Sequence, residues 1–132
     1  MTDADVKNKL SELYKANLSN AYEISKILTD NGCDDVLVLD VGLLCDLAQF
    51  FIIATTKSTT HLFGVYKYVE DYIKENELPL LNKKTKGMGD SWLFIDVNSI
   101  IVHLMDQNTR SFYELEKLWY KAPIVDHSSK SS

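Results

Sequence analysis

Hydrophobic positions near the start of the chain recur at the spacing of a helix. Val6, Leu10, Leu13 and Tyr14 lie three or four residues apart, which predicts an amphipathic helix over residues 4–15. The stretch "NAYE", which begins at residue 20, has the Asn-x-x-Glu form of a capping box. A second helix is therefore predicted from there to the Asn-Gly pair at 31–32, where glycine favours a helix end.

Short runs of β-branched and aromatic residues predict four strands further along the chain. These strands cover 35–41, 50–56, 92–97 and 100–105, with helices from Ser58 or Thr59 to about Asn76 and over 108–119, and a polar loop over 82–90. The segment between the first two strands is too short for a crossover helix, so these strands are expected to be antiparallel neighbours. The order of elements predicts a single α/β domain whose mixed sheet is flanked by helices.

The last two strands form a hairpin if Asn98 and Ser99 are its two-residue loop. That loop determines which side chains share a face, because side chains alternate along a strand. One face is then entirely aliphatic and is predicted to be core: Leu93, Ile95, Val97, Ile100, Val102 and Leu104. The other face is mixed: Trp92, Phe94, Asp96, Ile101, His103 and Met105.

His103 in the mixed face has three interpretations. A helix of the same domain could cover the face and make His103 a satisfied, semi-buried residue. The face could instead be an exposed partner-binding surface, because interface centres are rich in aromatic residues and methionine. A catalytic or metal-binding role is the third interpretation. Zinc, however, requires further ligands at suitable spacing, and His61 and His127 lie far away in the sequence.

Composition restricts the partners and the compartment. The net charge of −5 argues against a protein that binds nucleic acid through electrostatic attraction to the phosphates, and it suits a basic partner. Cys33 and Cys45 lack metal-ligand spacing and are expected to be reduced thiols. With neither a signal peptide nor an apolar run of ~20 residues, the protein is expected to be cytoplasmic and not membrane-bound.

Two enzyme signatures are weak. Asp35 and Asp40 are five residues apart and so on opposite faces of one strand, which disfavours the paired carboxylates of a nucleotidyltransferase. The "KGMGD" stretch is followed by no helix that could meet a phosphate. We therefore expect no catalytic residue, no metal and no cofactor. A nucleotidyltransferase-like enzyme and a protein-binding adaptor are both left open by the residues alone.

The stretch "GDSWLFIDVNSIIVHLMDQNTRSFYELEKLW" resembles the closing half of the Iojap family of ribosomal silencing factors. The resemblance extends upstream through "DVLVLDV" and "LAQFFIIAT" and covers about residues 18–120. It implies a nucleotidyltransferase-like topology without the catalytic site. It also implies a 1–17 N-terminal helical extension, an 18–122 silencing domain and a 123–132 flexible tail, whose "HSSKSS" is expected to be disordered.

The resemblance further implies that the protein binds the large ribosomal subunit through its protein fourteen, blocks subunit joining and represses translation under nutrient limitation. The alternatives are the nucleotidyltransferase-like enzyme and a protein-binding adaptor with a non-ribosomal partner. The free protein could also hide the mixed face in a homodimer. The residues implied in partner binding, with those added from the mixed face, are Trp92, Leu93, Phe94, Asp96, His103, Met105, Arg110 and Tyr113. Glu116 and Trp119 are expected to support the last helix, in which Arg110 and Glu114 are i,i+4 partners and Leu115, Leu118 and Trp119 form the buried stripe.

Three positions depart from the family pattern. Thr56 and Lys57 replace a Gly-containing turn, Lys86 replaces an acidic residue, and Asn98-Ser99 replaces a Gly-Asp turn. A backbone contact at the first of these positions and an acidic contact at Lys86 are therefore not expected here.

Overall fold

A computed structural model describes residues 2–80, 82–86, 91–97 and 99–128 of the 132-residue chain. Its elements, in chain order, are α1 (Asp3–Asp30), β1 (Asp34–Asp40), β2 (Phe50–Thr55), α2 (Thr59–Glu75), β3 (Asn82–Lys86), β4 (Trp92–Val97), β5 (Ile100–Met105), α3 (Gln107–Tyr113), α4 (Leu115–Leu118) and β6 (Ile124–Ser128). No helix within the described residues is long and apolar enough to cross a membrane.

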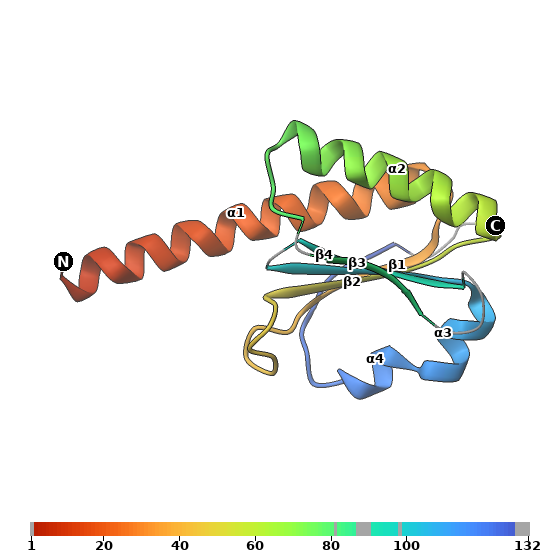
Figure 1. The fold of residues 1–132 in the computed structure, drawn as a ribbon. Coiled ribbons are helices and arrows are strands. Elements are labelled where there is room, and N and C mark those ends of the chain that lie inside the picture. The colour runs from red at the N-terminus through yellow and green to blue at the C-terminus, as the bar shows by residue number, and fades with distance from the viewer. Residues whose placement is uncertain (1, 81, 87–90, 98, 129–132) are drawn as a thin grey trace.

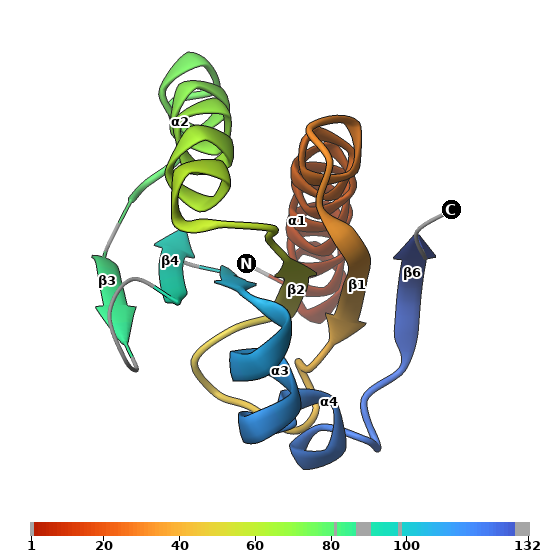
Figure 2. The same ribbon diagram turned by 90° about the vertical axis from the view of Figure 1, so that its right-hand side faces the viewer.

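The six strands form one sheet in the order β3-β4-β5-β2-β1-β6. Strands β2 and β5 are parallel, and the other neighbouring pairs are antiparallel. The predicted mixed sheet and the antiparallel pairing of the first two strands are both confirmed. Helices α1 and α2 cover one face of the sheet, and α3 and α4 lie on the other (Figures 1 and 2).

Hairpin β4–β5 has the predicted register. Phe94 pairs with His103, Asp96 with Ile101, and Ile95 with Val102. All six side chains of the predicted aliphatic face are buried and belong to the core beneath α1 and α2. Of the predicted turn, Asn98 lies outside the described residues.

The prediction for the amino-terminal part of the chain was wrong in one respect. One continuous helix, α1, replaces the two helices that were expected there. Thr2 caps α1 through a capping box with Asp5. Asn20, the expected second cap, lies inside the helix, where its amide oxygen accepts a hydrogen bond from the Tyr72 hydroxyl at 2.8 Å. No glycine or proline separates the two expected helices, so nothing in the backbone interrupts them.

Three further expectations need correction. Residues 82–86 of the expected loop form the edge strand β3, paired with β4. Residues 124–128 of the expected flexible tail form β6, paired with β1, because Val125 packs against the core beneath α1 and α2. The expected last helix is split at Glu114 into α3 and α4. The 1–17 and 18–122 division of the chain stays a prediction, and α1 runs through its boundary.

Candidate partner-binding site

The mixed face of β4 and β5 holds an aromatic cluster centred on His103. Trp92 Nε1 donates a hydrogen bond to His103 Nδ1 across 3.3 Å. The Phe94 ring is stacked on the imidazole at 6.0 Å between centroids, and the Phe51 ring meets it edge-on at 5.1 Å. Because an indole N–H only donates, His103 Nδ1 must accept, so the neutral imidazole carries its proton on Nε2.

The part of this face around His103 is covered, so the expectation of an exposed binding face centred on that residue was wrong. The exposed fraction is 7% for His103, 8% for Trp92 and 0% for Met105. The physical reason is that α3 follows β5 directly, so that α3, α4 and the chain leading to β6 fold over the mixed residues (Figure 2). The structure therefore supports the first interpretation of His103, a residue enclosed beneath a helix of its own domain.

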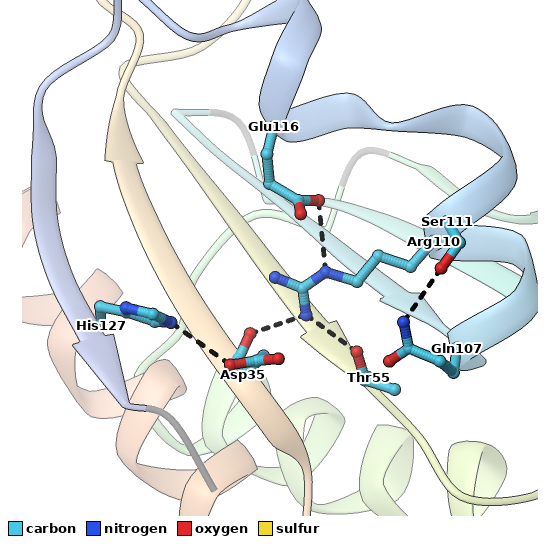
Figure 3. Close-up of polar contacts among 7 residues, drawn as sticks. All are labelled: Asp35, Thr55, Gln107, Arg110, Ser111, Glu116 and His127. Carbon is cyan, nitrogen blue, oxygen red and sulfur yellow. Dashed lines mark hydrogen bonds and ion pairs between the residues drawn. The ribbon is translucent and has the colours of Figure 1, made fainter.

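Arg110 anchors α3 to the sheet. Helix α3 begins after Asp106, whose carboxylate accepts a hydrogen bond from the Thr109 backbone at 2.7 Å. One turn later the Arg110 guanidinium reaches inward (Figure 3) and donates from Nη1 to the Asp35 carbonyl at 2.7 Å and to Thr55 Oγ1 at 2.9 Å. Only 7% of Arg110 is exposed. A buried guanidinium with several acceptors connects helix and sheet more firmly than a solvated ion pair does.

Glu116, not Glu114, is the acidic partner of Arg110. Arg110 Nε lies 3.2 Å from Glu116 Oε1, whereas Glu114 pairs with Lys117 at the surface. On a continuous helix, residues six apart lie on different sides, about 9 Å apart along the axis. The break at Glu114, whose φ is 51°, brings Glu116 back over the guanidinium. The expected Arg110–Glu114 pair was therefore wrong.

On both sides of the break, α3, α4 and the residues just after α4 expose large apolar side chains to solvent. The exposed fraction is 80% for Phe112, 41% for Tyr113, 71% for Leu118 and 75% for Tyr120. Leu118 was expected in the buried stripe, whereas Leu115 is buried and Trp119 is half-buried against Phe51 as predicted. Large exposed apolar residues concentrated on two short consecutive helices are typical of an interaction surface.

The exposed cluster and the aromatic cluster are in direct contact. The Tyr113 ring lies 4.7 Å from the Trp92 ring and 5.0 Å from that of Phe112. Phe94 and Asp96 are half-buried on β4, on the same face of the hairpin as Trp92. Of the eight predicted partner-binding residues, Phe94, Asp96 and Tyr113 are accessible. Trp92, His103, Met105 and Arg110 are buried on the side of the sheet that α3 and α4 cover, whereas Leu93 is buried on the opposite side, in the core beneath α1 and α2.

Sequence reasoning missed Phe112, Leu118 and Tyr120. A signal was present, since apolar residues in "SFYELEKLWY" occupy more positions than one helix face can bury. Which of them faced water depended on the break at Glu114.

The carboxylates considered for metal chemistry have structural partners. Asp40 accepts hydrogen bonds from Tyr14, Gln49 and the Gly42 backbone, the shortest at 2.6 Å. Asp35, at the other end of β1, lies 3.4 Å from His127. A Cβ at Gly42 would lie 2.3 Å from Gln49 Nε2, so a larger residue there would displace the Gln49 side chain that donates to Asp40. Among the described residues, no group of three or more His, Cys, Asp or Glu gathers in a metal-binding arrangement.

The turn that departs from the family pattern serves as the entry to α2. The Thr56 backbone donates to the Met105 carbonyl at 2.8 Å, and Ser58 caps α2 by accepting from the His61 backbone. Lys57 donates its backbone N–H to His61 Nδ1 at 2.9 Å. His61 Nε2 therefore donates to the Asn31 carbonyl at 2.7 Å and links the end of α1 to the start of α2.

Comparison with solved structures shows the same fold elsewhere. A crystal structure of a protein from Chromobacterium violaceum superposes with a TM-score of 0.70, covering 86% of this chain and 89% of the other at 23% sequence identity. At that identity, the likeness concerns the fold alone.

Comparison of sequences identifies the family. Residues 15–132 match the family described as "Ribosomal silencing factor during starvation". The ribosomal silencing factor RsfS of Bacillus subtilis is 31% identical over 98 residues, which are 74% of this chain and 81% of that protein. The mouse protein named "Mitochondrial assembly of ribosomal large subunit protein 1" is 32% identical over 96 residues, 70% of this chain and 42% of its own length. The chain therefore belongs to the RsfS family of ribosomal silencing factors, the Iojap family.

Proposed function

We propose that this protein binds the large ribosomal subunit through its protein fourteen, at the face that meets the small subunit, and thereby blocks subunit joining. Translation would be repressed in this way when nutrients are limiting. Membership of the silencing-factor family supports the proposal, and so does the mouse relative whose name refers to the large ribosomal subunit. Such a role requires the protein to share the cytoplasm with its ribosomes.

The observation that carries the proposal is the exposed apolar surface on α3 and α4. Phe112, Tyr113, Leu118 and Tyr120 present aromatic and aliphatic groups to solvent, and aromatic anchors typically dominate binding energy at interface centres. Beneath them, the buried Arg110 and the Trp92–His103 pair hold α3 against the sheet. A rigid support lowers the entropic cost of binding, because the anchors need not be ordered on contact.

Charge supports a basic partner. The chain carries a net charge of −5, and Asp96 lies at the border of the surface on β4. A ribosomal protein, which binds RNA phosphates, offers the complementary charge. Electrostatic complementarity would speed association and orient the two surfaces.

The decisive experiment is a pull-down with purified large subunits, with and without protein fourteen. Tyr113→Ala and Leu118→Ser should each weaken binding at least tenfold, since loss of an interface anchor typically costs about 2 kcal/mol. Tyr68→Ala is the matched control, because Tyr68 is 55% exposed on α2, across the sheet. The same two variants should restore subunit joining. Equal binding to subunits that lack protein fourteen would refute the proposed contact.

The proposal includes no catalysis. Incubation with nucleoside triphosphates and Mg²⁺ should give no transfer or hydrolysis above buffer, because Asp40 is engaged by three hydrogen-bond donors. A turnover that Asp40→Asn abolishes while the fold persists would favour the nucleotidyltransferase-like alternative. Binding to an unrelated protein, with none to large subunits, would favour the adaptor.

A further inference from the structure

The amino-terminal half of α1 extends beyond the sheet. Figure 1 shows this half projecting away from the other elements, at the end opposite α3. Ala21 is the first buried residue of α1 within the described chain. Before it, Val6, Leu10 and Leu13 are 41%, 61% and 56% exposed. The helix predicted from these residues exists, but the described part of the domain leaves most of its apolar stripe uncovered.

The stripe has the spacing of a coiled-coil seam. Val6, Leu10, Leu13 and Asn17 are separated by four, three and four residues, which is the alternation of a and d positions in a heptad. Lys7 and Lys9 flank the seam. Two heptads form a marginal helix alone, so this segment gains stability when another helix packs on it.

A groove adjoins the stripe. Its volume is about 420 Å³, and it lies between the projecting helix and the loop that joins β1 to β2. Leu10, Leu13 and Asn17 line one side, while Cys45, Asp46 and Leu47 line the other. Leu47 is 79% exposed, and Leu43 in the same loop is 97% exposed. The apolar surface therefore continues from the helix onto the loop.

The projecting segment largely precedes the shared domain of the family, whose match begins at residue 15. The silencing domain thus does not account for the stripe. It also lies on another part of the molecule from the exposed residues of α3 and α4 (Figure 1).

We propose that two copies of this chain pair through the projecting halves of α1, side by side and antiparallel. Leu10 of each copy packs against Leu13 of the other, and Val6 against Asn17 of the other. The amino-terminal turns of each helix then enter the groove of the second copy and cover Leu47. A two-fold axis makes the interface self-complementary, as in most homodimers.

The charges along the helix favour a second copy of this chain as the partner, and they favour antiparallel over parallel pairing. In an antiparallel pair, e positions flank e positions and g positions flank g positions, so Lys7 lies next to Tyr14 of the other copy and Lys9 next to Ala16 of the other copy. No like charges meet. Asp46 lines the same groove as Tyr14 and Asn17, and its carboxylate offers an opposite charge to the lysines that the second copy brings there. A parallel pair would place Asp3 against Asp3 at an a position, and like charges there are unfavourable.

Sedimentation equilibrium over about 1 to 100 μM, the range of moderate affinities, tests the pairing. The chain should pass from monomer to dimer across this range, and Leu10→Glu with Leu13→Glu should stay monomeric at every concentration. Tyr68→Glu, at a site 55% exposed on α2, is the control and should dimerise like the parent. Circular dichroism should show all variants folded. A parent that stays monomeric throughout, or a double variant that dimerises equally well, would overturn the proposal.

Cross-linking tests the direction. In a Cys45→Ser background, Leu10→Cys and Leu13→Cys chains are oxidised separately and as a mixture. Antiparallel pairing predicts that the mixed disulfide, which joins one Leu10→Cys chain to one Leu13→Cys chain, forms faster than either homodimeric product. Faster self-linking of the Leu10→Cys chain would instead indicate a parallel pair and refute the arrangement. In the parent chain, alkylation of Cys45 should slow as concentration rises.

Discussion

Trp92 Nε1 donates to His103 Nδ1 across 3.3 Å within hairpin β4–β5, beneath helix α3. The two residues lie on neighbouring strands, where Trp92 pairs with Met105 and His103 with Phe94. The hydrogen bond therefore runs diagonally across the sheet and ties the first residue of β4 to the fourth of β5. The Tyr113 ring packs against the indole of Trp92, so the Trp92–His103 pair supports the proposed ribosome-binding surface from below.

Truncation of Trp92 should lower stability, not only binding. Trp92→Ala is expected to reduce the free energy of unfolding by about 3–5 kcal/mol, the usual cost of deleting a buried large aromatic residue. Trp92→Phe keeps most of the ring but removes the donor to His103, and should cost about 1–3 kcal/mol. Urea denaturation measures both values. Tyr68→Ala on the exposed face of α2 is the control and should stay within about 0.5 kcal/mol of the parent.

Val102→Asp should unfold the domain. Val102 is fully buried in the core beneath α1 and α2, and a buried carboxylate without a partner costs several kcal/mol against a total stability of ~5–15 kcal/mol. Val6→Asp makes the same chemical change at a site that is 41% exposed, and should leave a folded monomer. A cooperative thermal transition in Val102→Asp near that of the parent would contradict the assignment of this face as core.

The sequence predicted the hairpin well because its register follows from the short loop and from the alternation of side chains. Once that loop is accepted, Phe94 must lie opposite His103, and the six aliphatic residues must share a face. The register says nothing of what covers the other face. That depends on where α3 and α4 lie, and hence on the φ of 51° at Glu114.

A glutamate at position 114 does not predict left-handed backbone, because that conformation is usually adopted by glycine or asparagine. The pattern alone therefore favoured one unbroken helix over 108–119, with Arg110 paired to Glu114. Likewise, the sequence at Asn20 does match a helix-capping pattern. In the structure, however, the Asn20 amide oxygen accepts a hydrogen bond from the Tyr72 hydroxyl, which joins α1 to α2. Local signals failed where a distant residue supplied the competing partner.

The two cysteines should differ sharply in reactivity. Both thiols are free, as expected. Burial raises the pKa of Cys33 from 9.0 to about 12, and the negative charge of Asp34 adds to the shift. Since the thiolate is the reactive form, Cys33 should resist iodoacetamide near pH 8 until urea unfolds the chain. Half-buried Cys45 should react in the folded state of the monomer. Mass spectrometry of the labelled chain resolves the two sites.

The raised pKa of Cys33 also predicts a pH dependence of stability. Below pH 9 the thiol is protonated in both the folded and the unfolded chain, so its contribution is fully present. As pH rises from about 9 towards 12, only the unfolded chain loses the proton, and the free energy of unfolding falls. Cys33→Ala, which removes this titration, should show a shallower fall over that range. Equal slopes for the two proteins would show that other groups account for the loss.

Arg110 gives the last prediction, because its three contacts require a planar guanidinium in one orientation. Arg110→Met fills much of the same space but leaves the Asp35 carbonyl and Thr55 Oγ1 without their donor, and Glu116 without its cation. Each buried acceptor left unsatisfied costs about 1–3 kcal/mol. We therefore expect a marked loss of stability, and Arg110→Lys should recover little of it, because one ammonium cannot reproduce the fork.

Lys117→Met is the matched control for Arg110→Met. It also removes a cation next to a glutamate, but its pair with Glu114 is exposed, and such pairs are worth at most about 1 kcal/mol. Urea denaturation should separate the two variants clearly. Amide hydrogen exchange should then be faster in α3 and α4 of Arg110→Met. Helices α1 and α2 should be less affected, because Arg110 links only α3 and α4 to the sheet. Equal losses for Arg110→Met and Lys117→Met would mean that the buried guanidinium does not hold α3 in place.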